Sequence, residues 1–346
     1  MFILLIIIDL LLIVSEVISR LVIAVSFVTI SDFTTSLHLL FYSVLIISVV
    51  YFVVRSQTRQ LIRIKKLLRE KERTLLNIEN QKAELESKNK SITDSLTYAQ
   101  RIQEALLPSE DYFRRYFKES FIFYKPKDII SGDFFWIGEN EESVFIAAAD
   151  CTGHGVPGAL MSMIGHELLD KIINVDKVKR PDRVLEIMNK SLEKTFNREK
   201  NIGTIIHDGM DIGICVVDRG KRKIQFAGAF FPLYIIRDNR LIEFKGDKLI
   251  LGETPEGVSF TNNEIALMDD DMVYLFSDGY VDQFGGSANK KFMYRRFRYL
   301  LMTIYRFPVE DQKSVLEENI KAWMGDTSQV DDILVMGFKP VPSGRI

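Results

Sequence analysis

The spacing of apolar and polar residues divides the chain into three parts. Residues 33–54 form a 22-residue run without Asp, Glu, Lys or Arg. A helix of that length rises about 33 Å, which is enough to cross a hydrocarbon core of roughly 30 Å. Residues 2–30 are also apolar, but Asp9, Glu16 and Arg20 interrupt them. Because Glu16 and Arg20 are four residues apart and can pair on one helix face, we expect a first, imperfect span here.

The charge distribution predicts the orientation of this membrane segment. Residues 1–54 have a net charge of −2, whereas residues 55–73 have a net charge of +6. A cluster of Lys and Arg directly after a span marks its cytoplasmic end, and residues 31–38 contain neither residue type. The pattern therefore predicts a multi-pass hairpin over residues 1–54 in the inner (plasma) membrane, with the remainder of the chain in the cytoplasm.

A repeat of apolar positions in alternating steps of three and four runs from residue 61 to residue 106. Ten of its fourteen positions are apolar, namely Leu61, Ile64, Leu68, Leu75, Ile78, Leu85, Ile92, Leu96, Ala99 and Leu106. The polar exceptions are Lys71, Lys82, Asn89 and Gln103. A sustained period of 3.5 residues predicts a coiled coil and therefore a homodimer, with a single solvated helix as the alternative.

Pro108 is the expected end of this helix and the boundary of the last domain. The expected domains are the membrane hairpin (1–54), the basic segment with the coiled-coil signalling helix (55–107), and a folded domain (108–346). Within the last domain, short runs rich in Val, Ile and Phe predict strands at 121–124, 144–149, 212–217, 233–236, 272–276 and 333–338. Helical patterns lie at about 157–173, 182–196, 291–304 and 311–324. The mixed order predicts an α+β layered domain.

Four acidic sites lie at the ends of these strands, namely Asp133, Asp150, Asp278 and the pair Asp331 and Asp332. Carboxylate oxygens are the ligands that Mg²⁺ and Mn²⁺ prefer, and a neighbouring glycine lets the backbone come close. A single aspartate of this kind is more often a turn residue. Four such sites in one domain favour a two-metal centre.

The overall composition excludes several classes of protein. The chain has 346 residues, of which 47% are hydrophobic, a net charge of −2 and a pI near 6.2. These values exclude a collagen-like chain and a wholly disordered one, and they predict no nucleic-acid partner. Two cysteines, Cys151 and Cys215, are too few for a disulfide framework.

Five blocks of sequence together resemble a known family. They are Ala-Gln-Arg-Ile-Gln-Glu-Ala-Leu-Leu-Pro (99–108), Lys-Pro-Lys-Asp-Ile-Ile-Ser-Gly-Asp-Phe-Phe-Trp (125–136), Ala-Asp-Cys-Thr-Gly-His-Gly-Val-Pro-Gly-Ala (149–159), Ser-Asp-Gly-Tyr-Val-Asp-Gln (277–283) and Gln-Val-Asp-Asp-Ile-Leu-Val (329–335). Their order over residues 96–339 resembles the SpoIIE-type branch of the PP2C (PPM) serine/threonine phosphatases. The resemblance implies a four-layer αββα sandwich of two antiparallel sheets flanked by helices. It also implies two Mn²⁺ or Mg²⁺ ions, with room for a third.

The resemblance assigns a role to each acidic site. Asp150 would bridge both ions, and the backbone carbonyl of Cys151 would bind one of them. Asp133 would bind the second ion, while Asp278 and Asp331 would hold the first. Asp332 would be either a support behind the ligands or an alternate ligand. Asp211 and Asp282 are weaker candidates for an outer ion.

The expected mechanism needs no nucleophilic side chain, because two metal ions lower the pKa of a bridging water and the resulting hydroxide attacks phosphorus. His154 is a candidate acid for the leaving alkoxide, although a turn role fits it equally. Lys125 and Lys127 are weak candidates for phosphate contact. The expected substrate is a phosphoserine or phosphothreonine on a partner protein, by resemblance an anti-sigma-factor antagonist. Phe230 and Phe231 stand where many relatives have polar residues, and this departure could reshape substrate docking.

Other enzyme classes fit the sequence poorly. A cysteine phosphatase needs Arg six residues after its nucleophile, and Pro157 stands there after Cys151. A zinc protease needs a second His where Asp170 stands after His166. A sensor histidine kinase shares the hairpin and coiled coil, but its ATP-binding glycines are missing. A non-catalytic membrane scaffold is the remaining alternative.

Overall fold

The computed structural model describes residues 12, 14–20, 22–23, 33–140, 142–153, 155–197, 209–218, 220–255 and 257–341. Contacts between residues divide the chain into two units, Met1–Lys90 and Ser91–Ile346. The second unit therefore includes the last residues of the long helix α2 (Phe33–Leu106), which ends two residues before Pro108.

The first unit consists of helix in its described part. Residues 14–20 are helical, and Arg20 donates to Glu16 across 2.9 Å, which confirms the expected pair. Most of the first span predicted for residues 2–30 lies outside the described residues. Among the described residues, α2 is the one helix long and apolar enough to cross a membrane, with a mean hydropathy of 2.4 in its most apolar window.

The repeat of apolar positions lies on exposed surface of α2 within the first unit. Leu75, Ile78 and Leu85 are each more than half exposed on the single chain. Pairs four residues apart, such as Lys88 with Glu84 at 2.7 Å, flank them. An apolar stripe of this kind on an otherwise charged helix fits a second helix, and the coiled coil stays a prediction.

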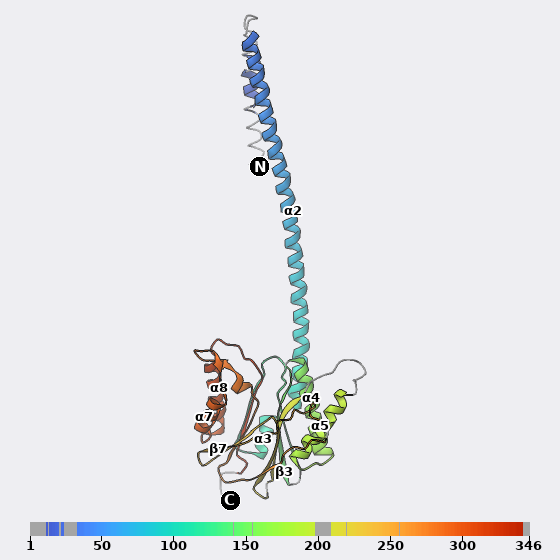
Figure 1. Ribbon diagram of the computed structural model, residues 1–346, viewed down its shortest axis with the longest axis vertical. Coiled ribbons are helices and arrows are strands. Elements are labelled where there is room, and N and C mark those ends of the chain that lie inside the picture. Colours follow the sequence, from blue (N-terminus) through green and yellow to red (C-terminus); the bar gives the residue numbers. More distant parts are fainter. Residues whose placement is uncertain are drawn as a thin grey trace. The chain divides into compact units, whose positions relative to one another are not determined.

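The second unit is built on two antiparallel five-stranded sheets (Figure 1). The first sheet has the order β1 (Ser120–Lys125), β12 (Ile333–Phe338), β9 (Met272–Phe276), β6 (Leu233–Arg237), β7 (Arg240–Phe244). The second sheet has the order β2 (Phe134–Glu139), β3 (Ser143–Cys151), β4 (Met210–Asp218), β5 (Lys223–Ala229), β8 (Asn263–Ala266). A short ribbon joins β10 (Phe284–Gly285) to β11 (Lys290–Lys291).

Helices cover the outer face of each sheet, so the domain has four layers in the order αββα (Figure 1). The first sheet carries α7 (Tyr294–Ile304) and α8 (Val309–Met324). The second sheet carries α4 (Val156–Leu169), its π-helical continuation η1 (Asp170–Val175) and α5 (Pro181–Asn197). The short helices are α3 (Glu110–Tyr116) and α6 (Gly279–Asp282). The predicted four-layer sandwich is confirmed.

The central strands are apolar on both faces because each sheet is buried twice. In β4, Ile212, Ile214 and Val216 pack under the helices, while Cys215 and Val217 face the other sheet. Successive side chains of a strand point to opposite faces, so a run without polar alternation fits a strand between two layers. This is why the six apolar runs predicted their strands correctly.

Among the described residues, six strands, including the two-residue β10 and β11, and the short helices α3 and α6 were missed. β5 and β2 contain Gly, Gln or Trp among their apolar residues, and β7 and β8 are short edge strands with exposed positions. The helix α3 has only seven residues, begins at the cap Ser109 and buries Phe113. Such segments have weak local patterns and depend on the neighbouring strand or core for their shape.

One buried ion pair provides a test of the fold. Arg237 donates to both carboxylate oxygens of Asp271, at 2.7 and 2.6 Å, and Asp271 is 1% exposed. Replacing Arg237 with Ala leaves a buried carboxylate without its cation, so Arg237→Ala should lower the free energy of unfolding by about 3 kcal/mol. Urea unfolding of residues 91–346 measures this.

The matched control is Arg240→Ala, because Arg240 lies opposite Arg237 in the same hairpin and is exposed. Its effect should stay within about 0.5 kcal/mol. Equal losses in the two variants would show that the pair with Asp271 does not hold this edge of the sheet.

Candidate metal centre

The antiparallel pairing brings the predicted acidic sites to one end of the sandwich. In the second sheet, Phe134 pairs with Ala149, so Asp133 before β2 lies beside Asp150 at the end of β3. In the first sheet, Val335 pairs with Phe276, so the start of β12 lies beside the end of β9. Asp331 and Asp332 precede β12, and Asp278 follows β9. Each sheet therefore contributes two of the four sites.

Asp133 is tied to the opposite sheet. Its side chain is buried, with 1% exposure, and it accepts a hydrogen bond of 2.5 Å from the Ser277 hydroxyl. Ser277 in turn accepts the backbone N–H of Leu334 at 3.0 Å. The Tyr124 hydroxyl donates to the Asp133 backbone carbonyl at 3.1 Å. Ser277 thus holds the side chain of Asp133, and Tyr124 holds its backbone. The sequence alone assigned neither residue a role in the site.

Asp332 organises the loop that leads to Asp133. Its two carboxylate oxygens accept the backbone N–H groups of Lys127 and Gly132, both at 2.7 Å. Its own N–H donates to the Asp331 carboxylate at 2.9 Å. Both oxygens accept backbone donors, as the supporting role predicts. The alternate-ligand role stays a prediction, because a carboxylate oxygen can accept more than one bond.

Asp150, Asp211 and Asp278 complete the acidic group. Asp150 and Asp211 are direct cross-strand partners on β3 and β4. Burial, followed by the charges of Asp133 and Asp278, raises the pKa of Asp150 well above its ordinary value. Burial and the charge of Asp278 raise the pKa of Asp211 to about 6. Asp211 therefore lies within electrostatic reach of the group, as its candidate role for an outer ion requires.

The raised pKa values of the other members have the same physical cause. Burial and the charges of Asp282 and Asp331 raise the pKa of Asp278 to about 6, against a hydrogen bond with Asp150 that lowers it. Burial raises the pKa of Asp133 strongly, and the hydrogen bond from Ser277 opposes this only in part. The acids repel one another in a poorly solvated space, and this repulsion is what a bound cation removes.

The donor set fits hard divalent cations. It consists of carboxylates from both sheets, with the backbone carbonyl of Cys151 adjoining Asp150. Mg²⁺ and Mn²⁺ prefer such oxygen ligands. Within the described ranges, no group of three or more His, Cys, Asp or Glu side chains is arranged so that it could hold a metal ion as it stands. Two of the carboxylates, those of Asp133 and Asp332, are hydrogen-bonded to Ser277, Lys127 and Gly132.

Glycines allow the backbone segments around the acids to touch. A Cβ on Gly279 would lie 1.8 Å from the backbone oxygen of Asp332. A Cβ on Gly132 would lie 3.2 Å from the backbone oxygens of Cys151 and Gly153. The glycines next to Asp133 and Asp278 are therefore required by close backbone packing, as the sequence pattern indicated.

The remaining candidates have different surroundings. His154 lies outside the described residues. Burial and the charge of Asp150 raise the pKa of the Cys151 thiol well above its ordinary value, so it is no thiolate nucleophile. Burial raises the pKa of Asp331, and the backbone hydrogen bond from Asp332 and the charge of Lys127 oppose this only in part. Phe231 is core, whereas Phe230 is 46% exposed.

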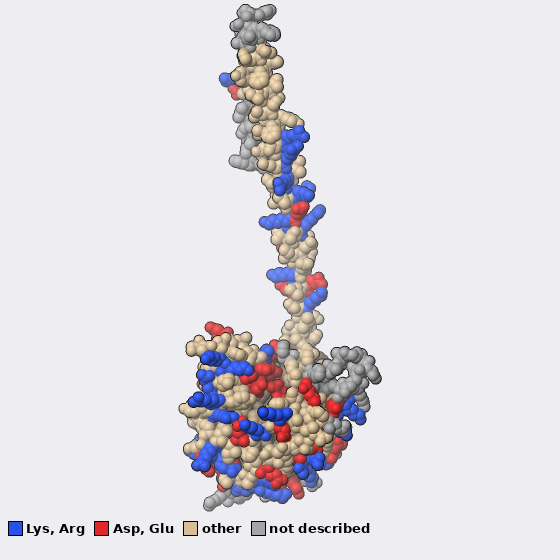
Figure 2. All heavy atoms as spheres, viewed as in Figure 1, with Lys and Arg blue, Asp and Glu red and all other residues tan. Residues whose placement is uncertain are grey.

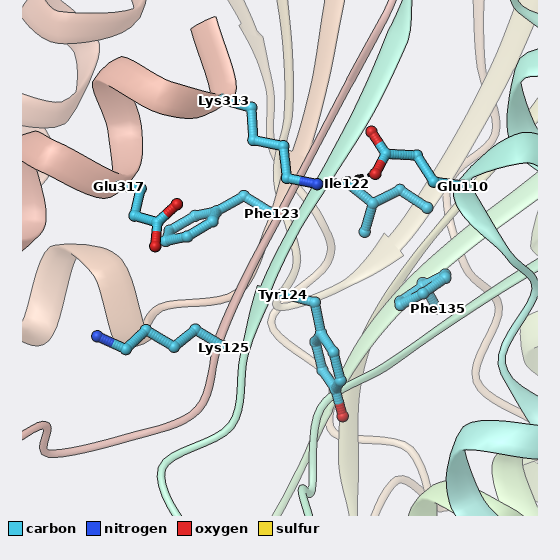
Figure 3. A pocket seen from close by; sticks show the side chains of 8 residues that line it. All are labelled: Glu110, Ile122, Phe123, Tyr124, Lys125, Phe135, Lys313 and Glu317. Carbon is cyan, nitrogen blue, oxygen red and sulfur yellow. Dashed lines mark hydrogen bonds and ion pairs between the residues drawn. The ribbon is translucent and has the colours of Figure 1, made fainter. Parts of the chain in front are cut away.

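Lys125 faces a separate cavity of about 390 Å³ beneath α3 and α8 (Figure 3). There Lys313 pairs with Glu110 at 2.8 Å, and the rings of Tyr124 and Phe135 form part of the wall. Figure 3 shows the Lys125 side chain extending away from the Tyr124 hydroxyl that holds Asp133. Lys125 therefore belongs to this cavity rather than to the acidic group.

Comparison with known proteins agrees with the fold. A family model described as Stage II sporulation protein E (SpoIIE) matches residues 140–340. The chain is 28% identical over 158 residues to "Phosphoserine phosphatase RsbU" of Bacillus subtilis (strain 168), which is 44% of this chain and 44% of that relative's length. The chain thus spans less than half of that curated relative.

Two solved structures share the architecture. The SiaA-PP2C domain of Pseudomonas aeruginosa is 32% identical with a TM-score of 0.66, covering 72% of this chain and 98% of that chain. The PP2C phosphatase domain of SpoIIE from Bacillus subtilis, with a fragment of its regulatory domain, has a TM-score of 0.52 at 16% identity, covering 63% of this chain and 62% of that chain. The sandwich excludes the histidine kinase alternative. The chain belongs to the SpoIIE family, and its folded unit is a PP2C-type serine phosphatase domain.

Proposed function

We propose that the chain is a membrane-anchored, metal-dependent phosphatase that hydrolyses phosphoserine or phosphothreonine on a regulatory partner protein. The observation that carries this proposal is the convergence of Asp133, Asp150, Asp278 and Asp331 from two sheets at one end of the sandwich. Family membership supports the reaction class. The partner by resemblance is an anti-sigma-factor antagonist, and the relative named RsbU is a phosphoserine phosphatase.

Different residues of this chain would bind the cations, position the ligands and donate a proton. Asp150, Asp278 and Asp331 would hold two Mn²⁺ or Mg²⁺ ions together with Asp133 and the Cys151 carbonyl, and Asp211 and Asp282 would be weaker candidates for an outer ion. When bound, the cations supply an activated water and neutralise charge on the phosphoryl group. Ser277 and Tyr124 fix Asp133, and Asp332 fixes the loop before it. His154 remains the candidate proton donor.

The membrane part of the proposal rests on α2 and the charges that follow its apolar end. Residues 33–54 are helical and uncharged, and the bases of residues 55–73 follow at once. We infer a multi-pass hairpin in the inner (plasma) membrane, with the phosphatase domain in the cytoplasm. The exposed stripe with Leu75, Ile78 and Leu85 supports a parallel homodimer through a coiled coil.

The final turns of α2 contact the loop of the metal centre directly. The Gln103 amide donates to the Ser131 backbone carbonyl at 2.7 Å and to the Ser162 hydroxyl at 2.8 Å, and it accepts the Ser131 N–H at 3.1 Å. The Ser131 hydroxyl accepts the N–H of Asp133. Gln103 bonds Ser131, and Ser131 bonds Asp133, so two hydrogen-bonded steps connect α2 to a residue of the metal site. We propose that Gln103 transmits a change in the register of α2 to the phosphatase activity.

The surviving rival is a non-catalytic scaffold, which would have the same fold without turnover. Its discriminating test is hydrolysis of p-nitrophenyl phosphate by the full chain in detergent with Mn²⁺. Asp150→Asn and Asp278→Asn should each lower kcat/KM by about 100-fold or more, because each removes charge from the group that holds the cations. Asp311→Asn, an exposed acid on α8, is the matched control and should leave the rate unchanged. Absence of metal-dependent turnover in the folded native chain would establish the scaffold.

The stability of the metal-free protein should depend on pH. Because the folded-state pKa values of Asp211 and Asp278 are about 6, above their ordinary value of 3.8, the folded state binds more protons than the unfolded state between these values. Stability should therefore fall as pH rises from about 4 to about 6. Since cations bind the ionised carboxylates, the gain in Tm from Mn²⁺ over EDTA should be larger near pH 7 than near pH 5. Equal gains at both pH values would contradict a cation site made of these acids.

Coupling between helix register and activity is tested by inserting one Ala after Asn89. The insertion rotates the distal helix by about 100° against the domain, so turnover should change by several fold while the metal site keeps its residues. In a Gln103→Ala background the same insertion should have little further effect, because the contact that transmits the rotation is gone.

Gln100→Ala is the control background, since Gln100 lies on the same helix and donates to Glu104 on its surface. Dimers are verified by disulfide formation in Leu85→Cys. The coupling hypothesis fails if the insertion leaves the rate of the crosslinkable dimer unchanged, or if it acts equally in the two backgrounds.

A further inference from the structure

A groove on a second surface of the domain is lined by apolar and basic side chains. It lies between α7 and α8, on the outside of the first sheet, and encloses about 970 Å³. Its walls include Met293, Tyr299 and Trp323 and the cations Arg295 and Arg296. Met293 is 54% exposed and Tyr299 is 77% exposed, so large apolar groups face solvent beside the groove. Such a hollow between two helices is a common place for a partner segment to bind.

The α7 side of the groove is basic in a domain that is otherwise acidic, and Arg295 and Arg296 are the charged residues that line it in the described part of the chain. Residues 290–306 contain six Lys and Arg and no Asp or Glu, whereas residues 74–346 have a net charge of −6. Figure 2 shows Lys and Arg gathered on the side of the domain that carries α7 and α8. None of the described residues that line the groove is acidic. The electrostatics of the groove therefore favour an acidic partner.

Two of these cations are available to a partner. Lys291 and Arg298 are already paired, with Asp282 and Glu243 respectively. By contrast, Arg295 and Arg296 have no ion pair with any Asp or Glu in the described part of the chain. Arg296 lies over the Trp323 ring at 4.4 Å from its centroid, which holds its guanidinium at the groove wall. A planar, pre-positioned guanidinium of this kind binds carboxylates well.

The groove also contains an acceptor that lacks a donor. The side-chain oxygen of Asn319 on α8 is buried and has no hydrogen-bond partner among the described residues. A buried acceptor without a donor is unfavourable, but this oxygen has almost no accessible surface and does not contact a partner directly. An anionic lipid surface lies flat, so the concave shape of the groove favours a polypeptide.

The groove begins next to the metal centre. The N–H of Met293 donates to the Val281 carbonyl on α6 at 2.7 Å, and α6 begins directly after Asp278. Tyr294 packs against Phe276 with 6.4 Å between ring centroids. Burial and the charge of Asp278 raise the pKa of Tyr294 to about 12, so this ring is within electrostatic reach of the acids. A segment in the groove would therefore be close to a phosphorylated residue at the site.

We propose that the α7–α8 groove docks an acidic segment of the phosphoprotein substrate that has an apolar face, separate from the phosphorylated residue itself. The inference rests on the proposed phosphatase function and adds a determinant of substrate choice. The 11 residues of α7 extend about 16 Å, so a helix of roughly three turns fits along it. Carboxylates on that helix pair with Arg295 and Arg296, and its apolar face covers Met293 and Tyr299.

The test uses the full chain in detergent, two synthetic phosphoserine peptides and p-nitrophenyl phosphate. Both peptides have the same phosphoserine segment followed by an amphipathic helix with Leu at positions i, i+3, i+4 and i+7. One has Glu at the flanking positions, and the other has Lys there. We expect kcat/KM of the native chain to be about 10-fold higher for the Glu peptide.

The charge-reversal variant Arg295→Glu/Arg296→Glu should abolish or invert this preference, while its rate on p-nitrophenyl phosphate stays within about twofold because the groove does not touch that substrate. Arg295→Gln/Arg296→Gln should give an intermediate preference. Arg240→Glu is the control, since Arg240 is an exposed Arg on β7 outside the groove. An unchanged peptide preference in the reversal variant would overturn the proposal.

The experiment distinguishes a chain that lacks phosphatase activity from a groove that does not bind the acidic peptide. If the native chain does not hydrolyse p-nitrophenyl phosphate, fluorescence anisotropy of the labelled peptides still measures binding without turnover. Tighter binding of the Glu peptide, lost in the reversal variant, supports the groove in either case. A reversal variant that instead loses dimers, or loses binding to phosphatidylglycerol vesicles while its peptide preference is intact, shows that the surface has another occupant and overturns the proposal.

Discussion

Repulsion among buried carboxylates is the constraint on which the rest of this domain depends. Asp133, Asp150, Asp278 and Asp331 meet at one end of the sandwich, where burial and mutual charge raise their pKa values. Each acid alone would be tolerated at a strand end, but the group is held together only because two sheets pack face to face through a shared apolar layer. The core thus maintains an arrangement that the charges oppose, and a site of this kind favours divalent cations.

The supports of the site come from distant parts of the chain. Asp332 fixes the loop before Asp133 through two backbone hydrogen bonds, Ser277 bonds the Asp133 carboxylate from the opposite sheet, and Gln103 bonds the same loop from the end of α2. A shift of α2 within the domain would act on this loop before any other part of the site. The geometry therefore links the end of α2, the helix that contains the membrane-compatible segment, to the position of one acid.

Reaction chemistry and partner choice are separated in space. The acids lie between the sheets, whereas the basic groove lies on the outer helical layer and reaches the site through α6 and the head of α7. Sequence changes in the groove can alter which protein is bound without moving an acid. One fold can in this way be combined with different binding surfaces.

The sequence by itself determined the strands that are apolar on both faces, the ends of the main helices, the uncharged segment and the acids beside glycine, because each depends on local periodicity or on a short motif. Tertiary structure alone decided that Gln103, a polar exception in the heptad repeat, is buried in its own domain, where it contacts residues 28 and 59 positions away. It also decided that both oxygens of Asp332 bond backbone about 200 positions away, and that Ser277 and Tyr124 hold Asp133. Such contacts arise from the packing of the two sheets on each other and of α2 against α4 and the loop before Asp133, and no pattern along the chain encodes which distant donor meets which acceptor.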